Sequence, residues 1–355
     1  MPPRMSPLGK LSPEALEVSV FPHLGASRDE VIYGPGAGRD AAVIRIGAGR
    51  VLAMTTDPIS LVPALGAHES GRRSCHLVAS DLWTTGIPPA YAAVTLNLPP
   101  SLPDAERDAF IAGFGETCAE LGVAVVTGHT GSHAGCDLTV IGAATLSGVG
   151  DEGRWVGPPF VQAGDRVILT KGAAIEATAI AARMFPVRMA ERLDEEGLTR
   201  SRLMLAQVSV VADCRAALRV GVRDRGVAAL HDATEGGVLG GLIELARACR
   251  LDLRVTRSAI PVSAEARAAC ELFGIDPYWA LSEGALIIAA RPAHVAAILA
   301  ALADEGILAV DIGEVMRGNG SVWVAEPDGA VTTLTRTEPD PYWPAYDRAV
   351  RERWS

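Results

Sequence analysis

Two acidic residues stand close together in HDATEGG, residues 231–237. Asp232 and Glu235 lie among small residues, with the strand-like stretch GVAAL before them and the helix-like stretch VLGGLIELARAC after them. The N-terminus of a helix favours anions, and carboxylates beside phosphates usually bind a metal ion. The segment therefore predicts either a catalytic site or an ordinary helix cap, in which Asp232 or Thr234 caps and Glu235 lies in the first turn.

Three further aspartates stand at the margins of predicted strands and helices. Asp40 follows the glycine-rich turn GPGAG, Asp57 ends the apolar stretch VLAMTTD, and Asp81 lies late in an apolar helical stretch. An aspartate in such a helical stretch is costly unless it is paired or bound to a metal. Each residue alone could be a turn or cap residue, but ligands are usually bound where elements end. Together the three predict a carboxylate set for Mg²⁺ and a nucleotide.

Two loops of small residues could approach a phosphate. GPGAG, residues 34–38, has neither the Gly-Lys-Ser/Thr of a Walker A loop nor the Rossmann spacing, so it is a weak signal alone. VTGHTGSHAGCD, residues 126–137, is a second such loop between two predicted strands. Its His129, His133 and Cys136 have a spacing that suggests zinc, but no fourth ligand is near in sequence. We favour a nucleotide-facing loop and keep a zinc protein as the weaker alternative.

A third candidate contact is Lys171 in ILTKGAAIEAT, residues 168–178. The pattern predicts a strand, a glycine turn and the start of a helix. A cation and backbone N–H groups at such a turn could contact an anion. An ordinary strand-to-helix connection fits the same residues equally well, so both interpretations stay open.

The composition is that of a compact protein with two domains. A chain of 355 residues exceeds one ordinary core, and 49% of its residues are hydrophobic. The net charge of −10 argues against a surface for nucleic acid or an anionic membrane, although Mg²⁺ could still bring in a phosphate ligand. The 6 cysteines are scattered without a CxxC pair, and no apolar run resembles a signal peptide or a membrane span. We therefore expect a cytoplasmic protein with reduced thiols.

The pattern of elements starts afresh in the second half of the chain, which predicts an α+β fold of two mixed domains. Strands are predicted at residues 41–47, 51–57, 91–99, 123–128, 137–148, 166–172, 227–233, 285–290, 307–315 and 321–327. Helices are predicted near residues 12–25, 68–84, 104–121, 173–185, 201–219, 237–249, 263–273 and 293–304. The expected organisation is an arm (1–29), two domains (30–150 and 160–335) with a Gly- and Pro-rich linker over 148–165, and a tail (336–355).

These segments, taken in order, resemble the aminoimidazole-ribonucleotide-synthetase-related (PurM-like) ATP-binding superfamily. The collinear matches are GAGRDAAVI, TTDPI, HLVASDLWTTGIPPAYAAVTLNLP, VTGHT, GDRVILTKG, HDATEGG and GIDPYWALSEGAL, over roughly residues 30–320. A single match would be weak, but a collinear set is specific for the superfamily. The segments DPYWALSEG and GHT are most similar to the branch of the hydrogenase maturation protein HypE.

The resemblance implies a homodimer in which the N-terminal domains join their strands into a shared β-barrel. It also implies ATP and Mg²⁺ as cofactors, and phosphoryl transfer to an amide, carbonyl or phosphate oxygen of an acceptor. Carried over by position, the metal ligands would be Asp40, Asp57, Asp81 and Asp232. The nucleotide would contact Gly36, Gly38, Gly128, His129 and Thr130, with Lys171 as the further candidate named above. Asp232 and Glu235 would be the catalytic residues facing the acceptor.

Several departures from the family patterns concern the acceptor. HypE proteins end in Pro-Arg-Ile/Val-Cys, whose cysteine carries the group that is dehydrated, whereas this sequence ends in RERWS with no cysteine after Cys270. HypE also usually has arginine where this chain has Glu235. Thiamine-monophosphate kinase has Gly-Asp-Asp where Arg39 and Asp40 stand here, and selenophosphate synthetase has an N-terminal cysteine and lysine where only Lys10 is found. We therefore expect a retained nucleotide half and a changed acceptor half.

Two hypotheses of different classes follow. The first is an ATP- and Mg²⁺-dependent homodimeric enzyme acting on a small molecule or a carried amide. The second is a nucleotide-binding homodimer that serves as an assembly or maturation partner protein without its own chemistry. The aromatic residues Tyr342, Trp343, Tyr346 and Trp354 could form a docking surface for such a partner, or they could cover the core of the second domain.

Overall fold

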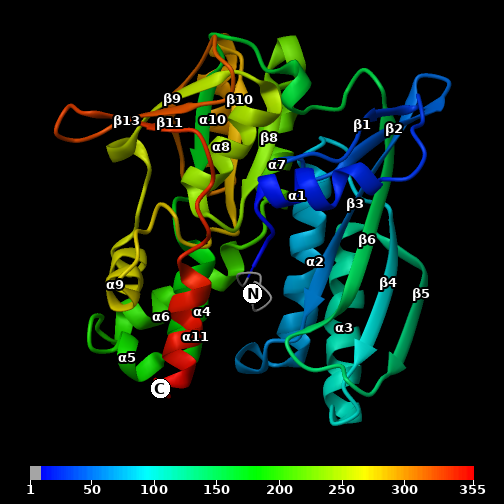
Figure 1. The fold of residues 1–355 in the computed structure, drawn as a ribbon, viewed down its shortest axis with the longest axis vertical. Helices are drawn as coiled ribbons and strands as arrows, with labels where there is room; N and C mark the ends of the chain where they lie inside the picture. The colour runs from blue at the N-terminus through cyan, green and yellow to red at the C-terminus, as the bar shows by residue number, and fades with distance from the viewer. Residues whose placement is uncertain (1–8) are drawn as a thin grey trace. The chain divides into compact units, whose positions relative to one another are not determined.

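The computed structural model describes residues 9–355 and divides the chain into two compact units. The N-terminal unit comprises Asp29–Gly34 and Asp40–Trp155. The C-terminal unit comprises Pro35–Arg39 and Val156–Ser355, together with the N-terminal segment that runs to Arg28. Residues 1–8 of the expected arm lie outside the described residues. Each unit combines helices with one open sheet, so the predicted pair of mixed α and β domains is confirmed (Figure 1).

The N-terminal unit contains a six-stranded sheet in the order β1-β2-β3-β6-β4-β5. Its strands are β1 (Val31–Tyr33), β2 (Ala42–Gly47), β3 (Arg50–Ser60), β4 (Tyr91–Leu98), β5 (Ala124–Ser132) and β6 (Val140–Asp151). Neighbouring strands are antiparallel except for the parallel pair of β4 and β5. Because β5 is the last strand in the order, one of its backbone edges is unpaired within the described chain.

Two helices of this unit, α2 (Ala67–Trp83) and α3 (Asp104–Leu121), cross at very close range. A Cβ atom on Gly71 would lie 2.2 Å from the carbonyl oxygen of Phe110, and one on Gly113 would lie 2.1 Å from that of His68. Only glycine allows backbones to approach so closely. The contact fixes α2, which carries the predicted metal ligand Asp81 near its C-terminus.

The C-terminal unit contains a seven-stranded sheet in the order β13-β12-β9-β11-β7-β10-β8. Its strands are β7 (Arg166–Thr170), β8 (Val227–Ala233), β9 (Asp252–Thr256), β10 (Ala285–Ala290), β11 (Ala309–Met316), β12 (Val322–Ala325) and β13 (Val331–Leu334). Every residue of β8 and β10 is buried. These two strands therefore form a rigid base for the residues that follow β8, among them the HDATEGG turn.

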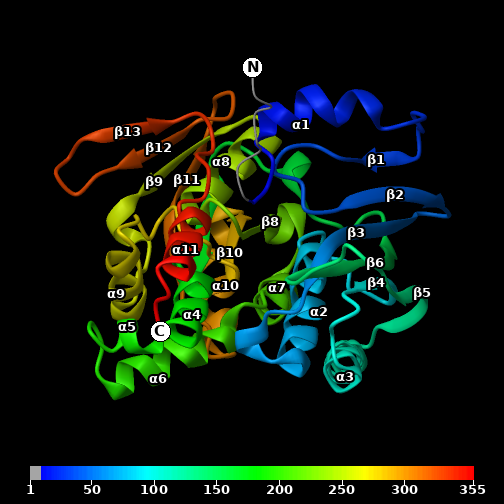
Figure 2. The same cartoon turned by 60° about the horizontal axis from the view of Figure 1, so that its bottom comes forward.

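The helices of this unit are α1 (Pro13–Ser19), α4 (Ile175–Met184), α5 (Pro186–Met189), α6 (Glu195–Leu203), α7 (Val211–Val220), α8 (Gly237–Cys249), α9 (Ala264–Phe273), α10 (Val295–Ala303) and α11 (Tyr342–Arg351). Figure 2 shows α11, from the C-terminal segment, beside α4 and α9. No helix among residues 9–355 combines the length and the apolar character that a membrane crossing requires.

The aromatic residues of the C-terminal segment cover the core of this unit. Tyr342 is fully buried, with its ring 5.6 Å from that of Phe273. Trp354 stacks on the same Phe273 at 5.6 Å, with 10° between the ring planes. Of the two uses predicted for these aromatics, the structure thus shows the packing role.

Some element predictions were wrong in their extent. The loop predicted over residues 126–137 begins as strand, because β5 continues through Ser132 in register with β4. The linker predicted over 148–165 begins as strand for the same kind of reason, since β6 pairs with β3 as far as Asp151. The single helix predicted over 201–219 is interrupted by a 3-10 turn at Met204–Gln207 that separates α6 from α7.

Candidate functional site

The HDATEGG segment links β8 to α8 through a tight turn. Asp232 lies inside β8 and is only 2% exposed, and α8 begins at Gly237 with Gly236 in the N-cap position. Gly236 and Gly237 have φ angles of 81° and 65°, the left-handed region that favours glycine. The alternative of a helix cap by Asp232 or Thr234 is therefore wrong, because these residues precede the cap and the two glycines make the turn. Glu235 likewise precedes the first turn of the helix.

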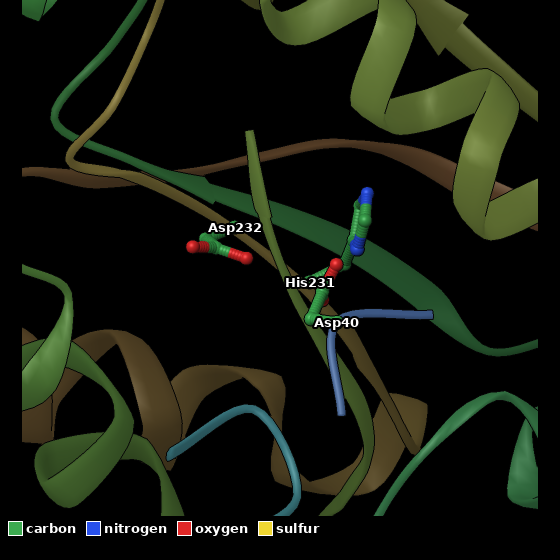
Figure 3. A group of neighbouring side chains, drawn as sticks. All are labelled: Asp40, His231 and Asp232. Atoms are coloured by element: carbon green, nitrogen blue, oxygen red, sulfur yellow. The ribbon is translucent and has the colours of Figure 1, made fainter. Parts of the chain in front are cut away.

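Asp232 has a buried neighbour, His231, that the sequence analysis did not assign. The two side chains leave the strand in different directions, but a ring nitrogen of His231 still lies within 4.8 Å of a carboxylate oxygen of Asp232 (Figure 3). His231 Nε2 lies 3.1 Å from Glu244 Oε2 on α8, and His231 is 2% exposed. Glu244 fixes the imidazole, so the strand and the helix on either side of the turn are joined through this pair.

Glu235 has a partner in the N-terminal segment. The backbone N–H of Lys10 donates to Glu235 Oε2 at 2.6 Å, and Lys10 Nζ donates to Thr234 Oγ1 at 3.1 Å. A hydrogen bond to the charged form of a carboxylate stabilises it. Glu235 is thus bound by the backbone of Lys10, a residue that the sequence analysis considered only in the comparison with selenophosphate synthetase.

Three of the segments singled out in the sequence meet at this end of the C-terminal sheet. Thr234 O accepts a hydrogen bond from Ser282 N at 3.2 Å, which joins HDATEGG to DPYWALSEG. Ser282 Oγ accepts from Ala174 N at 2.8 Å, which joins DPYWALSEG to the turn after β7. Ser282 therefore connects the starts of α4 and α8, through its hydroxyl on one side and its backbone N–H on the other.

Lys171 lies at the same end of β7, but its ammonium group is already occupied. Nζ donates to the carbonyl oxygens of Gln207, Ser209 and Gly284 at 3.1, 2.8 and 2.9 Å. It also lies 2.9 Å from Asp213 Oδ2. An ammonium has three donors. Of the two interpretations of Lys171, the structural connection therefore accounts for all of its hydrogen-bonding capacity.

The acids of the N-terminal unit are arranged around Thr55 on β3. Thr55 Oγ1 lies 2.8 Å from the carbonyl oxygen of Asp40 and 3.3 Å from Asp81 Oδ2 on α2. Asp57 follows Thr55 by two residues on β3, and residues at that spacing share one face of a strand. Asp57 thus lies inside β3 and not at its end as predicted, because β3 continues to Ser60 opposite β6. Sequence reasoning missed Thr55, although the Thr-Thr-Asp spacing would have placed it beside Asp57.

The aspartates near Thr55 match a hard divalent cation in their chemistry, but within the described residues their carboxylate oxygens do not all come within 4.8 Å of one another. Asp40, Asp57 and Asp81 offer only oxygen ligands, and all three are partly exposed, so water and phosphate oxygens could also reach a bound cation. These residues of the N-terminal unit would hold Mg²⁺, whose charge would neutralise that of bound phosphates. The chain's own contribution is to fix Asp81, whose carboxylate contacts Thr55 Oγ1 and whose helix α2 is held by the glycine contact with α3.

The predicted nucleotide residues fall in two places. Gly128, His129 and Thr130 are exposed residues of β5, where a Cβ on Gly128 would lie 2.3 Å from the carbonyl oxygen of Val94. Gly36 and Gly38 belong to the short segment Pro35–Arg39, which is grouped with the C-terminal unit. Gly38 has a φ of 71°, and a Cβ there would lie 2.5 Å from the carbonyl oxygen of Glu244. Both Gly38 and Gly128 are thus required by backbone packing.

The zinc alternative is contradicted. The rings of His129 and His133 stack with centroids 6.1 Å apart. Within the described residues, however, the ligand atoms of His129, His133 and Cys136 do not come within 4.8 Å of one another. Since zinc needs its ligands at 2.0–2.3 Å in a tetrahedron, this strand and loop do not form a zinc site.

Comparison with family models identifies both halves of the chain. Residues 38–148 match the N-terminal domain of AIR synthase related proteins, and residues 162–325 match their C-terminal domain. Together the matches span the carboxylates around Thr55 and the HDATEGG turn.

A curated relative and two solved structures agree with this match. The carbamoyl dehydratase HypE of Escherichia coli is 30% identical over 295 residues, which cover 82% of this chain and 83% of that protein. A crystal structure of E. coli HypE has a TM-score of 0.67 and 25% identity, covering 92% of this chain and 96% of that one. A structure of HypE in complex with ATP has a TM-score of 0.63 and 22% identity, covering 84% and 89%. By its matching domains and its fold, the chain belongs to the AIR synthase related family.

Proposed function

We propose that the protein is an ATP- and Mg²⁺-dependent enzyme that activates an oxygen of an acceptor by phosphoryl transfer. The observation that carries this proposal is the arrangement of Asp40, Thr55 and Asp81 in a chain of the AIR synthase related family. Phosphoryl transfer needs little covalent chemistry from the protein, and it is accelerated by positioning and by metal charge. Fixed carboxylates with open access are suited to that task.

Asp40, Asp57 and Asp81 would hold the metal of the nucleotide, and Asp232 would face the acceptor. Asp232 lies in the buried strand β8, directly before the turn that carries Glu235. Glu235 would face the acceptor, held by the hydrogen bond from the backbone N–H of Lys10. Phosphorylation converts an amide or carbonyl oxygen into a leaving group, and a phosphate oxygen into an anhydride.

The acceptor is proposed to be a separate molecule. In HypE the acceptor group is carried on the tail, but here the segment from Tyr342 to Trp354 packs on Phe185 and Phe273. Tyr342, Ala345 and Ala349 are each at most 3% exposed. Moving this segment to a reaction site would expose the core that it covers.

A homodimer is proposed to form through the edge strand β5. Val125 and Val126 on this strand are 52% and 60% exposed. They border an apolar groove of about 410 Å³ between β5 and α3, lined also by Phe110, Ile111 and Phe114. An exposed apolar edge strand is a site of association. Pairing with the same strand of a second copy would extend both open sheets toward the shared barrel implied by the resemblance.

The direct test is calorimetric titration with a non-hydrolysable ATP analogue, with and without Mg²⁺. We expect binding that requires Mg²⁺, and at least tenfold weaker binding for Asp57→Asn and Asp81→Asn, since each removes a charged metal ligand. Asp151→Asn is the matched control, because Asp151 lies on β6 of the same unit and pairs with Arg50 at the surface. Equal binding by all four proteins would overturn the metal assignment.

A second experiment distinguishes an enzyme from an assembly partner protein without its own chemistry. Release of ADP from Mg·ATP would be measured with amide, carboxylate and phosphate compounds as acceptors. Turnover with one of these classes supports the enzyme and names its substrate class. Mg²⁺-dependent binding without turnover, together with tight association with another protein, would instead establish the assembly or maturation partner.

A further inference from the structure

One carboxylate connects the C-terminal segment to the HDATEGG turn. Asp340 Oδ2 accepts a hydrogen bond from the backbone N–H of Gly236 at 2.8 Å. Asp340 Oδ1 accepts from the N–H of Tyr342 at 2.8 Å, and Asp340 is only 8% exposed. A residue more than one hundred positions away in sequence therefore satisfies a backbone donor in the turn that carries Glu235.

The turn depends on such a partner because its own residues leave the donor without one. Gly236 occupies the N-cap position of α8 in the left-handed conformation, and it has no side chain to satisfy nearby N–H groups. Backbone donors at a helix start need partners from elsewhere, since no turn of helix precedes them. The Asp340 carboxylate fills this role and fixes the plane of the peptide between Glu235 and Gly236.

Asp340 is itself held firmly from the other side. It directly precedes α11, whose Tyr342 is fully buried against Phe273. Burial raises the pKa of Asp340 to about 6, while the hydrogen bonds from Tyr342 and Gly236 act in the opposite direction. Because burial removes water from this carboxylate, the hydrogen bonds from Gly236 and Tyr342 must stabilise it instead.

We propose that Asp340 is a positioning residue that sets the geometry of the HDATEGG turn and thereby of Glu235 and Asp232. The inference rests on the function proposed above, since it assigns the turn to the acceptor. It makes the C-terminal segment a working part of the acceptor side, although that segment contributes no group to the reaction. Lys10 holds the turn independently through Glu235 and Thr234, so the loss of Asp340 loosens one end of the turn without freeing Glu235.

The test compares Asp340→Ala and Asp340→Asn with the matched control Asp347→Asn. Asp347 lies on the exposed side of α11, where it pairs with Arg351. Deuterium uptake of the peptide spanning residues 231–240 reports the turn. ADP release from Mg·ATP, with water or with the best acceptor of the screen above, reports function, and calorimetry with the non-hydrolysable analogue reports nucleotide binding.

For Asp340→Ala we expect faster exchange in the turn and about tenfold or more slower ADP release, because small displacements of reacting groups are costly. Nucleotide affinity should stay unchanged. Asp340→Asn keeps one acceptor oxygen and should recover part of the rate, and if the alanine variant does not fold, the asparagine variant carries the test. A residue that only stabilised the unit would lower the folded fraction and leave the rate per folded molecule intact.

The outcomes separate the two proposals. Wild type that fails to bind Mg²⁺ and nucleotide overturns the proposed function. Wild type that binds nucleotide and releases ADP, with Asp340→Ala unchanged in exchange or in rate per folded molecule, overturns only the role of Asp340.

Discussion

Lys171 Nζ lies 2.9 Å from Asp213 Oδ2, and the Asp213 side chain is only 1% exposed. The pair joins the turn after β7 to α7, and three carbonyl oxygens share the same ammonium group. The carbonyl contacts satisfy the remaining donors of the ammonium, whereas among the described residues no hydrogen bond reaches the Asp213 oxygens, so this carboxylate depends on Lys171. Lys171 is therefore an internal brace of the C-terminal unit.

Removing one partner of the Lys171–Asp213 pair should lower the free energy of unfolding more than replacing both partners by apolar residues. Lys171→Met leaves Asp213 buried without its cation, and we expect the free energy of unfolding to fall by about 3–5 kcal/mol. The double variant Lys171→Met/Asp213→Leu should recover part of that loss. Urea unfolding followed by circular dichroism measures both, with Arg219→Met, which breaks the exposed pair with Glu305, as a control of little effect. A double variant as unstable as the single one would show that the ammonium is needed for its carbonyl contacts.

The helices and strands differ in how well the sequence predicts them. Helices α2 and α3 lie within one residue of their predicted ranges, because the apolar periodicity of a helix involves residues only three or four positions apart. Strand β9 was missed, since its five residues carry charges at Asp252 and Arg254 and it is defined by pairing with β11 and β12. Pairing partners lie far away in sequence, and no local pattern shows them.

The candidate site shows the same division. Asp232 and Asp81 stand out locally, because acids inside apolar stretches are unusual. The roles of Thr55, Glu244 and Asp340 become visible only from contacts between segments distant in sequence. Lys171 shows the opposite error. Its local pattern indicated a contact with a bound anion, but its partner is Asp213, which lies far away in the sequence.

The close contact between α2 and α3 predicts contrasting effects for two glycines of one helix. Gly113→Ala would place a Cβ 2.1 Å from the carbonyl oxygen of His68, so the helices must separate. We expect a loss of about 1–3 kcal/mol or more in the free energy of unfolding. Gly115→Ala meets no atom within 4 Å and should gain up to about 1 kcal/mol from helix propensity. Denaturant unfolding of both variants measures the difference.

The Gly113 variant should also weaken nucleotide binding, because α2 carries Asp81. Gly115→Ala provides the control for that effect as well. Equal stability and equal nucleotide affinity of the two variants would show that the contact between α2 and α3 adjusts without strain.

The proposed dimer predicts that a charge on β5 produces monomers. Val126→Glu places a carboxylate on the edge strand, and like charges would meet across paired copies. Val187→Glu is the matched control, because Val187 is also 60% exposed but lies on α5 of the C-terminal unit. Sedimentation velocity at several concentrations should show a dimer for wild type and for the control, and a monomer for Val126→Glu. A dimer in all three would move the interface away from β5.

The raised pKa of Asp340 predicts a specific pH dependence of stability. The unfolded carboxyl titrates near 3.8, whereas burial raises the pKa in the folded protein to about 6, with the neighbouring Glu235 adding to the effect. Between these values the folded state holds a proton that the unfolded state has released. The contribution of Asp340 to the free energy of unfolding therefore falls as pH rises from about 4 to about 6, and it is constant above that. The interval between the two pKa values corresponds to about 3 kcal/mol.

Asp340→Asn has no such proton, so the difference in unfolding free energy between wild type and variant should shift in favour of the variant across this range. Urea unfolding at pH 4.5, 5.5 and 7 measures that difference. A difference independent of pH would place the pKa of Asp340 near its ordinary value and its carboxylate in contact with solvent.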